Sequence, residues 1–207
     1  MYTLYYLPDA CPLATQVILH ELNQPVNIIN MQDVADFSTV NPVRTVPVLV
    51  NENDKTQKHS FREGAAIILK LLNSHPNTLL PSEGMERDQA IENIMFANAT
   101  MHPAYGRLFF INQYIKDETA QAQAYEAATG AINGLWNVVE NQLATQKYLG
   151  GASPSAADIL LAVYARWGDS FPVDIEIGTR TQKMLDAVQN MPSFLKALAA
   201  EKAQVAA

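Results

Sequence analysis

The residue in this chain most suited to chemistry is Cys11, the only cysteine among 207 residues. It follows a strand-like apolar run, 2–7, that breaks at Pro8-Asp9-Ala10, and it precedes an amphipathic helical pattern. Pro12 suits the first turn of a helix, so we expect the sulfur at a helix N-terminus, where free N–H groups and the helix dipole favour a thiolate. The sequence therefore predicts a reactive thiol with a pKa below about 8.5. The alternative is a small buried hydrophobic residue.

Ala14 stands where a second, resolving cysteine would complete a redox turn of the thioredoxin type, Cys11-Pro12-Leu13-Ala14. Because the chain has no other cysteine, an intramolecular disulfide cannot form, and thiol chemistry needs an external thiol. Glutathione is the first such thiol to consider. A single free cysteine also fits a reducing cytoplasm.

The composition excludes several classes of partner. Hydrophobic residues make up 48% of the chain and charged residues 17%, which is typical of a globular protein. The formal net charge is −7 and no basic block occurs, which disfavours nucleic-acid binding because phosphate neutralisation needs clustered Lys and Arg. With neither a basic leader nor a long apolar stretch, we expect no secretion signal and no membrane span.

The first eighty residues alternate strand and helix signals. Strands are predicted at 2–7, 26–29, 46–50 and 60–62, and helices at 13–22 and 64–73. The polar run 51–58 reads as a loop between the last two strands. This order predicts an α/β domain with a small mixed sheet and helices packed on it.

A linker rich in Pro and Gly, 76–84, separates this part from a region in which the strand signal vanishes. The predicted domains are therefore 1–75 and an all-helical 85–207. Helical periodicity covers 85–115, 120–145, 155–166, 179–189 and 192–202. One helix start is well marked, because Ser155 and Asp158 form a capping box ahead of an apolar run.

Together these features resemble cytosolic glutathione transferases, most closely the bacterial beta class. Four motifs in the family's order and spacing carry the resemblance: 5–14, Asn41-Pro42 with Val46-Pro47-Val48-Leu49, Glu63-Gly64-Ala65-Ala66-Ile67, and Ser155-x-x-Asp158 followed by Trp167. The resemblance implies a thioredoxin-like N-terminal domain followed by the family's all-helical C-terminal domain, an α/β plus all-α architecture. It also implies a homodimer.

The resemblance implies a glutathione site in the first domain. The peptide before Pro47 is cis in the family, so that the backbone of Val46 pairs with the cysteinyl part of glutathione; the alternative is a trans proline opening an edge strand. Glu63 and Gly64 begin a helix whose N–H groups hold the γ-glutamyl carboxylate, and the Glu63 side chain pairs with the ammonium group. The alternative for Glu63 is a carboxylate that only stabilises the helix dipole. Gln32 is the nearest polar substitute for a ligand-contacting lysine missing from a shortened segment.

The resemblance also implies residues for catalysis and for a second substrate in the helical domain. His102 aligns with a histidine that faces the glutathione sulfur, and the alternative is a packing residue. Pro103 replaces the family's lysine and should kink the helix. An apolar second-substrate pocket is predicted from four aromatic residues, with a core role as the alternative. They are Tyr105, Phe109, Tyr164 and Trp167.

The implied function is that of a beta-class glutathione transferase with Cys11 and His102 as catalytic residues. It conjugates glutathione to a small hydrophobic electrophile, or uses it for thiol–disulfide exchange or peroxide reduction on an oxidant, in bacterial cytoplasmic detoxification. Glutathione is the co-substrate and no metal is expected. The alternative is a non-enzymatic adaptor that keeps the fold and binds a protein partner.

Overall fold

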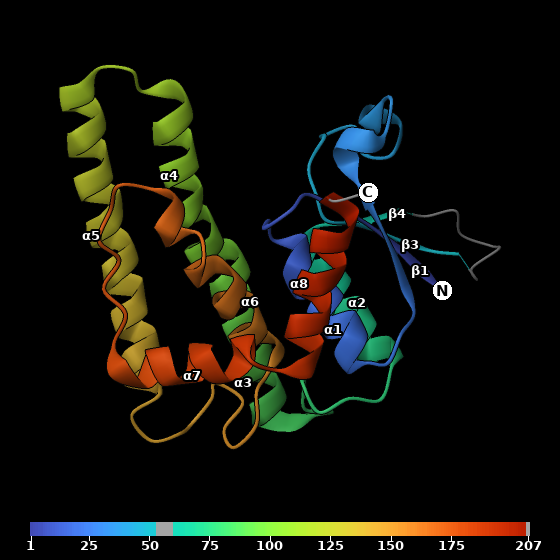
Figure 1. The fold of residues 1–207 in the computed structure, drawn as a ribbon. Coiled ribbons are helices and arrows are strands. Elements are labelled where there is room, and N and C mark those ends of the chain that lie inside the picture. Colours follow the sequence, from blue (N-terminus) through green and yellow to red (C-terminus); the bar gives the residue numbers. More distant parts are fainter. Residues whose placement is uncertain (53–59, 206–207) are drawn as a thin grey trace. The chain divides into compact units, whose positions relative to one another are not determined.

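The structure is a computed structural model that describes residues 1–52 and 60–205. The chain forms two compact units, one made of Met1–Thr78 with Gln189–Ala207 and the other of Leu79–Val188. Figure 1 colours the chain by sequence, so the red C-terminal helix can be followed into the first unit. The division at 76–84 that the sequence suggests stays a prediction.

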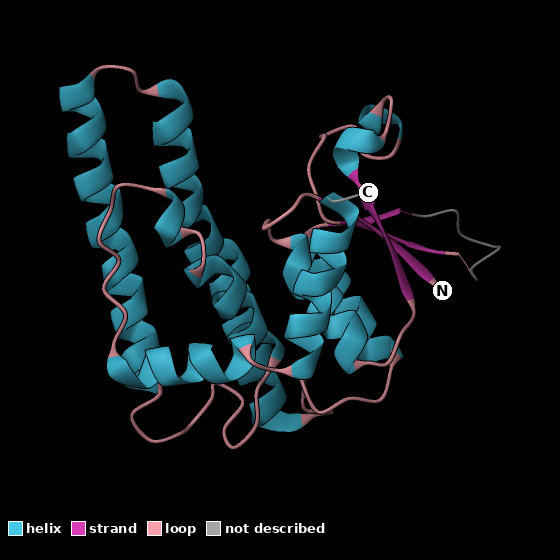
Figure 2. Ribbon diagram, viewed as in Figure 1, coloured by secondary structure: helices cyan, strands magenta, loops and turns pink. Residues whose placement is uncertain are grey.

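The first unit contains a four-stranded mixed sheet in the order β2-β1-β3-β4, drawn in magenta in Figure 2. Its strands are β1 (Tyr2–Tyr6), β2 (Val26–Asn30), β3 (Val48–Asn51) and β4 (Ser60–Arg62). β1 runs parallel to β2, whereas β3 is antiparallel to both β1 and β4. The predicted strands and the thioredoxin-like topology are confirmed. The predicted loop 51–58 lies mostly outside the described residues, which end at Glu52 and resume at Ser60.

Among its described residues, this unit also has three α-helices: α1 (Pro12–Glu21), α2 (Gly64–Ser74) and α8 (Pro192–Val205). α1 buries almost its whole length, since Leu13, Val17 and Ile18 have no exposed surface. Such a helix has to be covered on several sides. α2 and α8 both contact α1, and α8 contributes the buried Phe194. The C-terminal helix therefore belongs by its packing to the sheet-containing unit.

The shortened segment after β2 folds as two short 3₁₀ turns, Met31–Asp33 and Phe37–Thr39. Asn30 and Asp36 cap them, because their side-chain oxygens accept from the N–H groups of Gln32 and Ser38. Local side-chain caps of this kind hold a short connection without a full helix.

The second unit is helical, as predicted. It consists of α3 (Gly84–Met95), a π-helical turn (Phe96–Met101), α4 (His102–Tyr114), α5 (Glu118–Gln142), α6 (Ala156–Ala165) and α7 (Thr179–Gln189). α4 packs along α5, and the Nε1 of Trp136 donates to the hydroxyl of Tyr105 at 2.9 Å inside the core. This bond satisfies the two buried polar atoms of otherwise apolar side chains.

The predicted capping box begins α6. The Asp158 carboxylate accepts from the N–H and the hydroxyl of Ser155, at 2.8 and 2.7 Å, and the Ser155 hydroxyl accepts from the Asp158 N–H at 3.5 Å. Asp158 also accepts from the N–H of Leu149, so it ties the preceding turn to the helix. Its role is structural, as the sequence indicated.

Candidate functional site

Cys11 lies at the start of α1, where the sequence placed it, with Pro12 in the first turn. Its side chain is partly exposed, and its thiol donates a hydrogen bond to the carbonyl oxygen of Val46 at an Sγ–O distance of 3.5 Å. A carbonyl can only accept, so this contact favours the protonated thiol. The structure thus brings together two of the predicted site residues that are distant in sequence.

The pKa of Cys11 moves in the direction opposite to the sequence-based prediction. Burial raises it to about 12, and a backbone hydrogen bond to the sulfur opposes this effect only in part. Desolvation disfavours a thiolate, and here it outweighs the field of the helix N-terminus. The prediction of a pKa below about 8.5 is therefore wrong for the protein without ligand. Cys11 is a neutral hydrogen-bond donor in this state.

The peptide bond between Val46 and Pro47 is cis. The loop that leads to it is held by Asn41, a buried side chain whose Nδ2 donates to the carbonyl oxygen of Thr45 at 2.8 Å. Asn41 also donates its backbone N–H to the carbonyl oxygen of Phe37. These bonds explain why Asn41 belongs to the same motif as Pro47: it fixes the backbone just before the cis bond.

Glu63 and Gly64 lie at the start of α2, between strand β4 and the helix. Glu63 has a φ of 69°, in the left-handed region that non-glycine residues rarely adopt. Its side chain is exposed and makes no capping hydrogen bond. An unusual backbone at a helix N-terminus with an uncommitted carboxylate is the kind of arrangement that functional sites contain.

The sheet brings most predicted glutathione residues of the first unit to one edge. Val48 pairs with Arg62, so Pro47 and Glu63, the next residues outward, leave the sheet at the same end. Tyr6 of β1 pairs with Asn30 of β2, so the turn before Cys11 and the segment carrying Gln32 leave at the corresponding end of their strands. Tyr5 of β1 pairs with Val48 of β3, so the end of the β1–β2 pair and the end of the β3–β4 pair lie at the same edge of the sheet.

His102 opens α4 directly after the π-helical turn. Pro103 lacks an N–H and cannot continue the regular ladder, and the preceding turn is widened to the π form, so the predicted distortion is present. The imidazole lies 5.1 Å from the ring of Tyr164 and 5.2 Å from that of Trp167, centroid to centroid. Burial lowers the pKa of His102, so the ring is neutral near pH 7.

The four predicted pocket residues form one aromatic cluster with His102. Trp167 is its centre, with ring contacts to Tyr105, Phe109 and Tyr164. Tyr105 and Tyr164 have no exposed surface, whereas 47% of Phe109 is exposed. The buried pair acts as core within this unit, and Phe109 is the member able to meet a ligand. Sequence reasoning missed Phe171, which packs on Phe109 at 4.8 Å and lies in a loop without helical periodicity.

A cavity of about 460 Å³ in the second unit lies elsewhere. It is bordered by the first half of α5 and by residues 172–174, and it contains none of the predicted site residues. Within residues 1–52 and 60–205, no three His, Cys, Asp or Glu side chains are grouped so that they could hold a metal ion. In the same ranges, every helix is too short or too polar to cross a membrane.

Comparison of the sequence with known proteins finds one family model, the glutathione S-transferase C-terminal domain, which matches residues 104–200. Among curated proteins, the chain is 29% identical over 179 residues to glutathione S-transferase GST-4.5 of Xanthomonas campestris pv. campestris. That alignment covers 83% of this chain and 85% of the relative.

Comparison of the structure finds solved glutathione transferases over nearly the whole chain. The bacterial beta-class enzyme of Sphingomonas chungbukensis superposes with a TM-score of 0.82 at 25% identity, covering 96% of this chain and 98% of its own. A sphingomonad glutathione S-transferase solved in complex with glutathione has a TM-score of 0.83 at 25% identity, covering 97% and 98%.

Proposed function

We propose that the chain, which is similar to glutathione transferases in its C-terminal family match and over nearly its whole structure, is a beta-class enzyme that binds glutathione at the sheet edge of its first unit. The reaction is conjugation of glutathione to small hydrophobic electrophiles. The observation that carries this proposal is the contact between the neutral Cys11 thiol and the carbonyl of Val46, beside a cis proline.

The residues at the sheet edge suit the parts of glutathione. The backbone of Val46 pairs with the cysteinyl unit of the tripeptide. The N-terminus of α2, at Gly64, offers N–H groups to the γ-glutamyl carboxylate, and the free carboxylate of Glu63 takes the ammonium group. Gln32, exposed on its 3₁₀ turn, is available to the ligand's other end. A sphingomonad relative is known with glutathione bound.

In this proposal Cys11 acts as a donor to the ligand sulfur. When the cysteinyl backbone of glutathione pairs with Val46, the glutathione thiol loses its proton to solvent, and the Cys11 S–H turns from the Val46 carbonyl to the resulting thiolate and stabilises it. The thiolate then attacks the electrophile, its lone pair forms the new carbon–sulfur bond, and the leaving group takes the displaced electron pair. A thiol held neutral serves better as a donor than as an attacking nucleophile, so conjugation is favoured over disulfide exchange. His102, a neutral imidazole, is proposed to assist on the strength of the resemblance.

Two substitutions at Cys11 separate the donor role from a covalent role. Cys11→Ser keeps a donor but cannot form a disulfide, and Cys11→Ala removes both. A hydrogen bond to a charged group contributes about 1.5–3 kcal/mol, so kcat/KM for conjugation should fall roughly 10- to 150-fold in Cys11→Ala and only a few-fold in Cys11→Ser. Equal losses in the two variants would contradict the donor role.

Glutathione binding itself is tested by calorimetry. Glu63→Gln should weaken binding about 1.4- to 5-fold, because an exposed ion pair contributes about 0.2–1 kcal/mol. Glu21→Gln, an exposed carboxylate at the end of α1, is the matched control and should change nothing. A wild-type protein that passes through a glutathione-affinity column unretained would instead favour the adaptor alternative.

We also propose a homodimer. Two aromatic side chains of α4, Phe110 and Tyr114, are 59% and 61% exposed, and their rings are tilted against each other with a centroid distance of 4.9 Å. Exposed aromatic clusters of this kind are typical of interfaces. Sedimentation at micromolar concentration should show twice the chain mass, and Phe110→Ser should shift it toward monomer.

A further inference from the structure

The turn that carries Cys11 is tied to the far end of the chain. The backbone N–H of Asp9 donates to Oε2 of Glu201 at 3.1 Å, a contact between residues 192 positions apart. Glu201 lies on α8 and is only 4% exposed. Both residues belong to the same unit, so the contact is internal to it. Asp9 lies two residues before the cysteine.

Asp9 is a demanding position in this turn. Its φ is 55°, in the left-handed region, which costs a non-glycine residue energy. On either side the turn is closed by the Ala10 N–H donating to Leu7 and by the Leu13 N–H donating to Ala10. A carboxylate that accepts a hydrogen bond from the Asp9 N–H therefore stabilises the turn conformation in which Cys11 lies at the N-terminus of α1.

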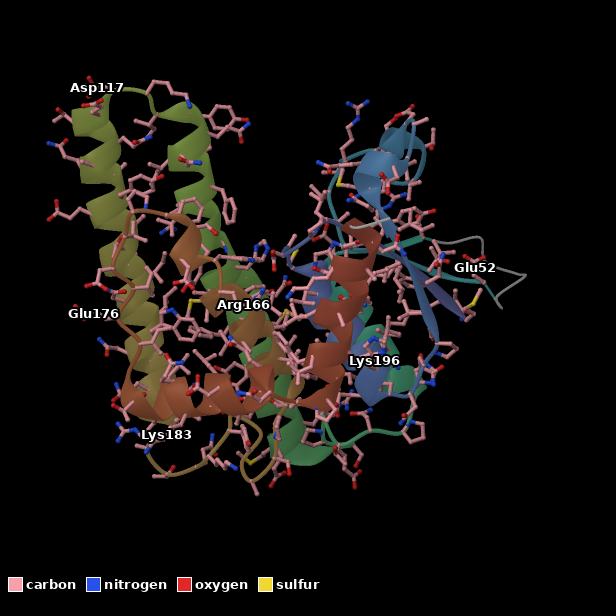
Figure 3. The ribbon with its side chains drawn as sticks, in the orientation of Figure 1. Glu52, Asp117, Arg166, Glu176, Lys183 and Lys196 are labelled. Atoms are coloured by element: carbon pink, nitrogen blue, oxygen red, sulfur yellow. The ribbon has the colours of Figure 1, made fainter. Side chains whose placement is uncertain are left out.

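α8 faces α1 with its polar residues as well as its apolar ones. Lys196 of α8, labelled in Figure 3, is close enough to lower the pKa of His20 on α1 as a second cause after burial. The pKa of Tyr6 is raised by burial first and then by the charge of Glu201. The charge of Glu201 is therefore felt at Tyr6, the last residue of β1, just before the turn that leads to Cys11.

Burying a carboxylate costs free energy unless it is paired or hydrogen-bonded. An apolar residue would fill this position on a packed helix at less cost. As a carboxylate, Glu201 accepts a hydrogen bond from the Asp9 backbone N–H, which an apolar residue at this position could not do. The Glu201 carboxylate therefore acts on the turn that leads to Cys11.

We propose that Glu201 is the positioning residue for Cys11, holding the β1–α1 turn through the Asp9 N–H so that the thiol points to Val46. This inference rests on the proposed function for its consequence in catalysis. The C-terminal helix thereby becomes part of the catalytic apparatus without touching the substrate.

Three variants test this: Glu201→Ala, Glu201→Gln, which keeps an oxygen acceptor, and Lys202→Ala, an exposed neighbour on α8 as the matched control. Hydrogen exchange of the Asp9 amide, followed by NMR, should accelerate at least tenfold in Glu201→Ala and remain close to wild type in the other two. For conjugation, kcat should fall about tenfold in Glu201→Ala with the KM for the electrophile unchanged, and Glu201→Gln should restore it.

The outcomes separate this inference from the proposed function. Unchanged exchange at Asp9 in Glu201→Ala overturns the inference, and so does accelerated exchange with an unchanged kcat. A wild-type protein that neither binds nor conjugates glutathione overturns the proposed function, while the exchange measurement still decides whether Glu201 holds the turn. If Glu201→Ala does not fold, Glu201→Asp, which withdraws the carboxylate by one methylene, replaces it with the same expected results.

Discussion

Oxidised glutathione can add to the thiol of Cys11, and the rate of this addition reports the thiolate population of that thiol. A cysteine at a helix N-terminus is expected to be acidic, yet the surroundings of this thiol raise its pKa to about 12. We predict that oxidised glutathione adds to Cys11 of the folded, ligand-free protein more slowly than to the same thiol in the unfolded chain. One glutathionyl group should be added per chain, because no other cysteine exists.

The magnitude follows from two opposing effects. Relative to its ordinary value of 9.0, the raised pKa of Cys11 reduces the thiolate population at pH 7.5 by about 10³, at a factor of ten for each unit. A thiolate of higher pKa is intrinsically more nucleophilic, with a Brønsted coefficient of about 0.4–0.5, which recovers about 15- to 30-fold. The net expectation is a rate about 30- to 60-fold lower in the folded state.

Intact-mass spectrometry at a series of pH values measures both quantities at once. The adduct rate of the folded protein should rise about tenfold for each pH unit up to pH 10 without a plateau, whereas the protein in denaturant should level off near pH 8.5–9. Cys11→Ala should show no adduct in either state. A plateau near pH 7, or a folded protein that reacts faster than the unfolded chain, would refute the argument that desolvation outweighs the helix N-terminus.

Three further predictions concern the stability of the second unit and its titration. Ser155→Ala should lower the free energy of unfolding by roughly 0.5–2 kcal/mol through loss of the cap on α6, seen as a lower urea midpoint; an unchanged midpoint with lost activity would place Ser155 in the site instead. Burial raises the pKa of Glu140, but hydrogen bonds from Thr181 and Arg180 lower it more. The ionised carboxylate therefore stabilises α7 above pH 4.5, and this stabilisation is lost as the pH falls through the lowered pKa. Glu140→Gln should reduce the dependence of the urea midpoint on pH between about pH 3 and 6. Because burial lowers the pKa of His102, protonation of its imidazole favours the unfolded state, and the free energy of unfolding should decline as the pH falls below 6.5. An NMR titration of the imidazole should give a midpoint under 6.5. A midpoint above 6.5 would contradict a buried imidazole.

Local sequence patterns predict the elements and their order. Apolar runs such as 2–7 predict the strands of the sheet, and the 3.6-residue patterns after residue 84 predict the helices, because a helical pattern reports which face of the helix is buried. The capping box at Ser155 and Asp158 was equally readable, since its partners are three residues apart. Motifs in a known order identify the predicted glutathione-binding residues at the sheet edge, and the roles of these residues remain predictions.

The protonation state of Cys11 and the contacts that hold its side chain follow from long-range packing and could not be predicted from local sequence patterns. Desolvation depends on atoms from every neighbouring segment, and the acceptor for the thiol comes from Val46, in a loop after the next strand. The partner of the Asp9 turn, Glu201, comes from the last helix, which periodicity could identify as a helix but could not assign to the first unit. Local sequence patterns specify which elements form, whereas long-range packing decides which elements contact one another. The charge state of a buried group depends on those contacts, because they decide how far the group is removed from water.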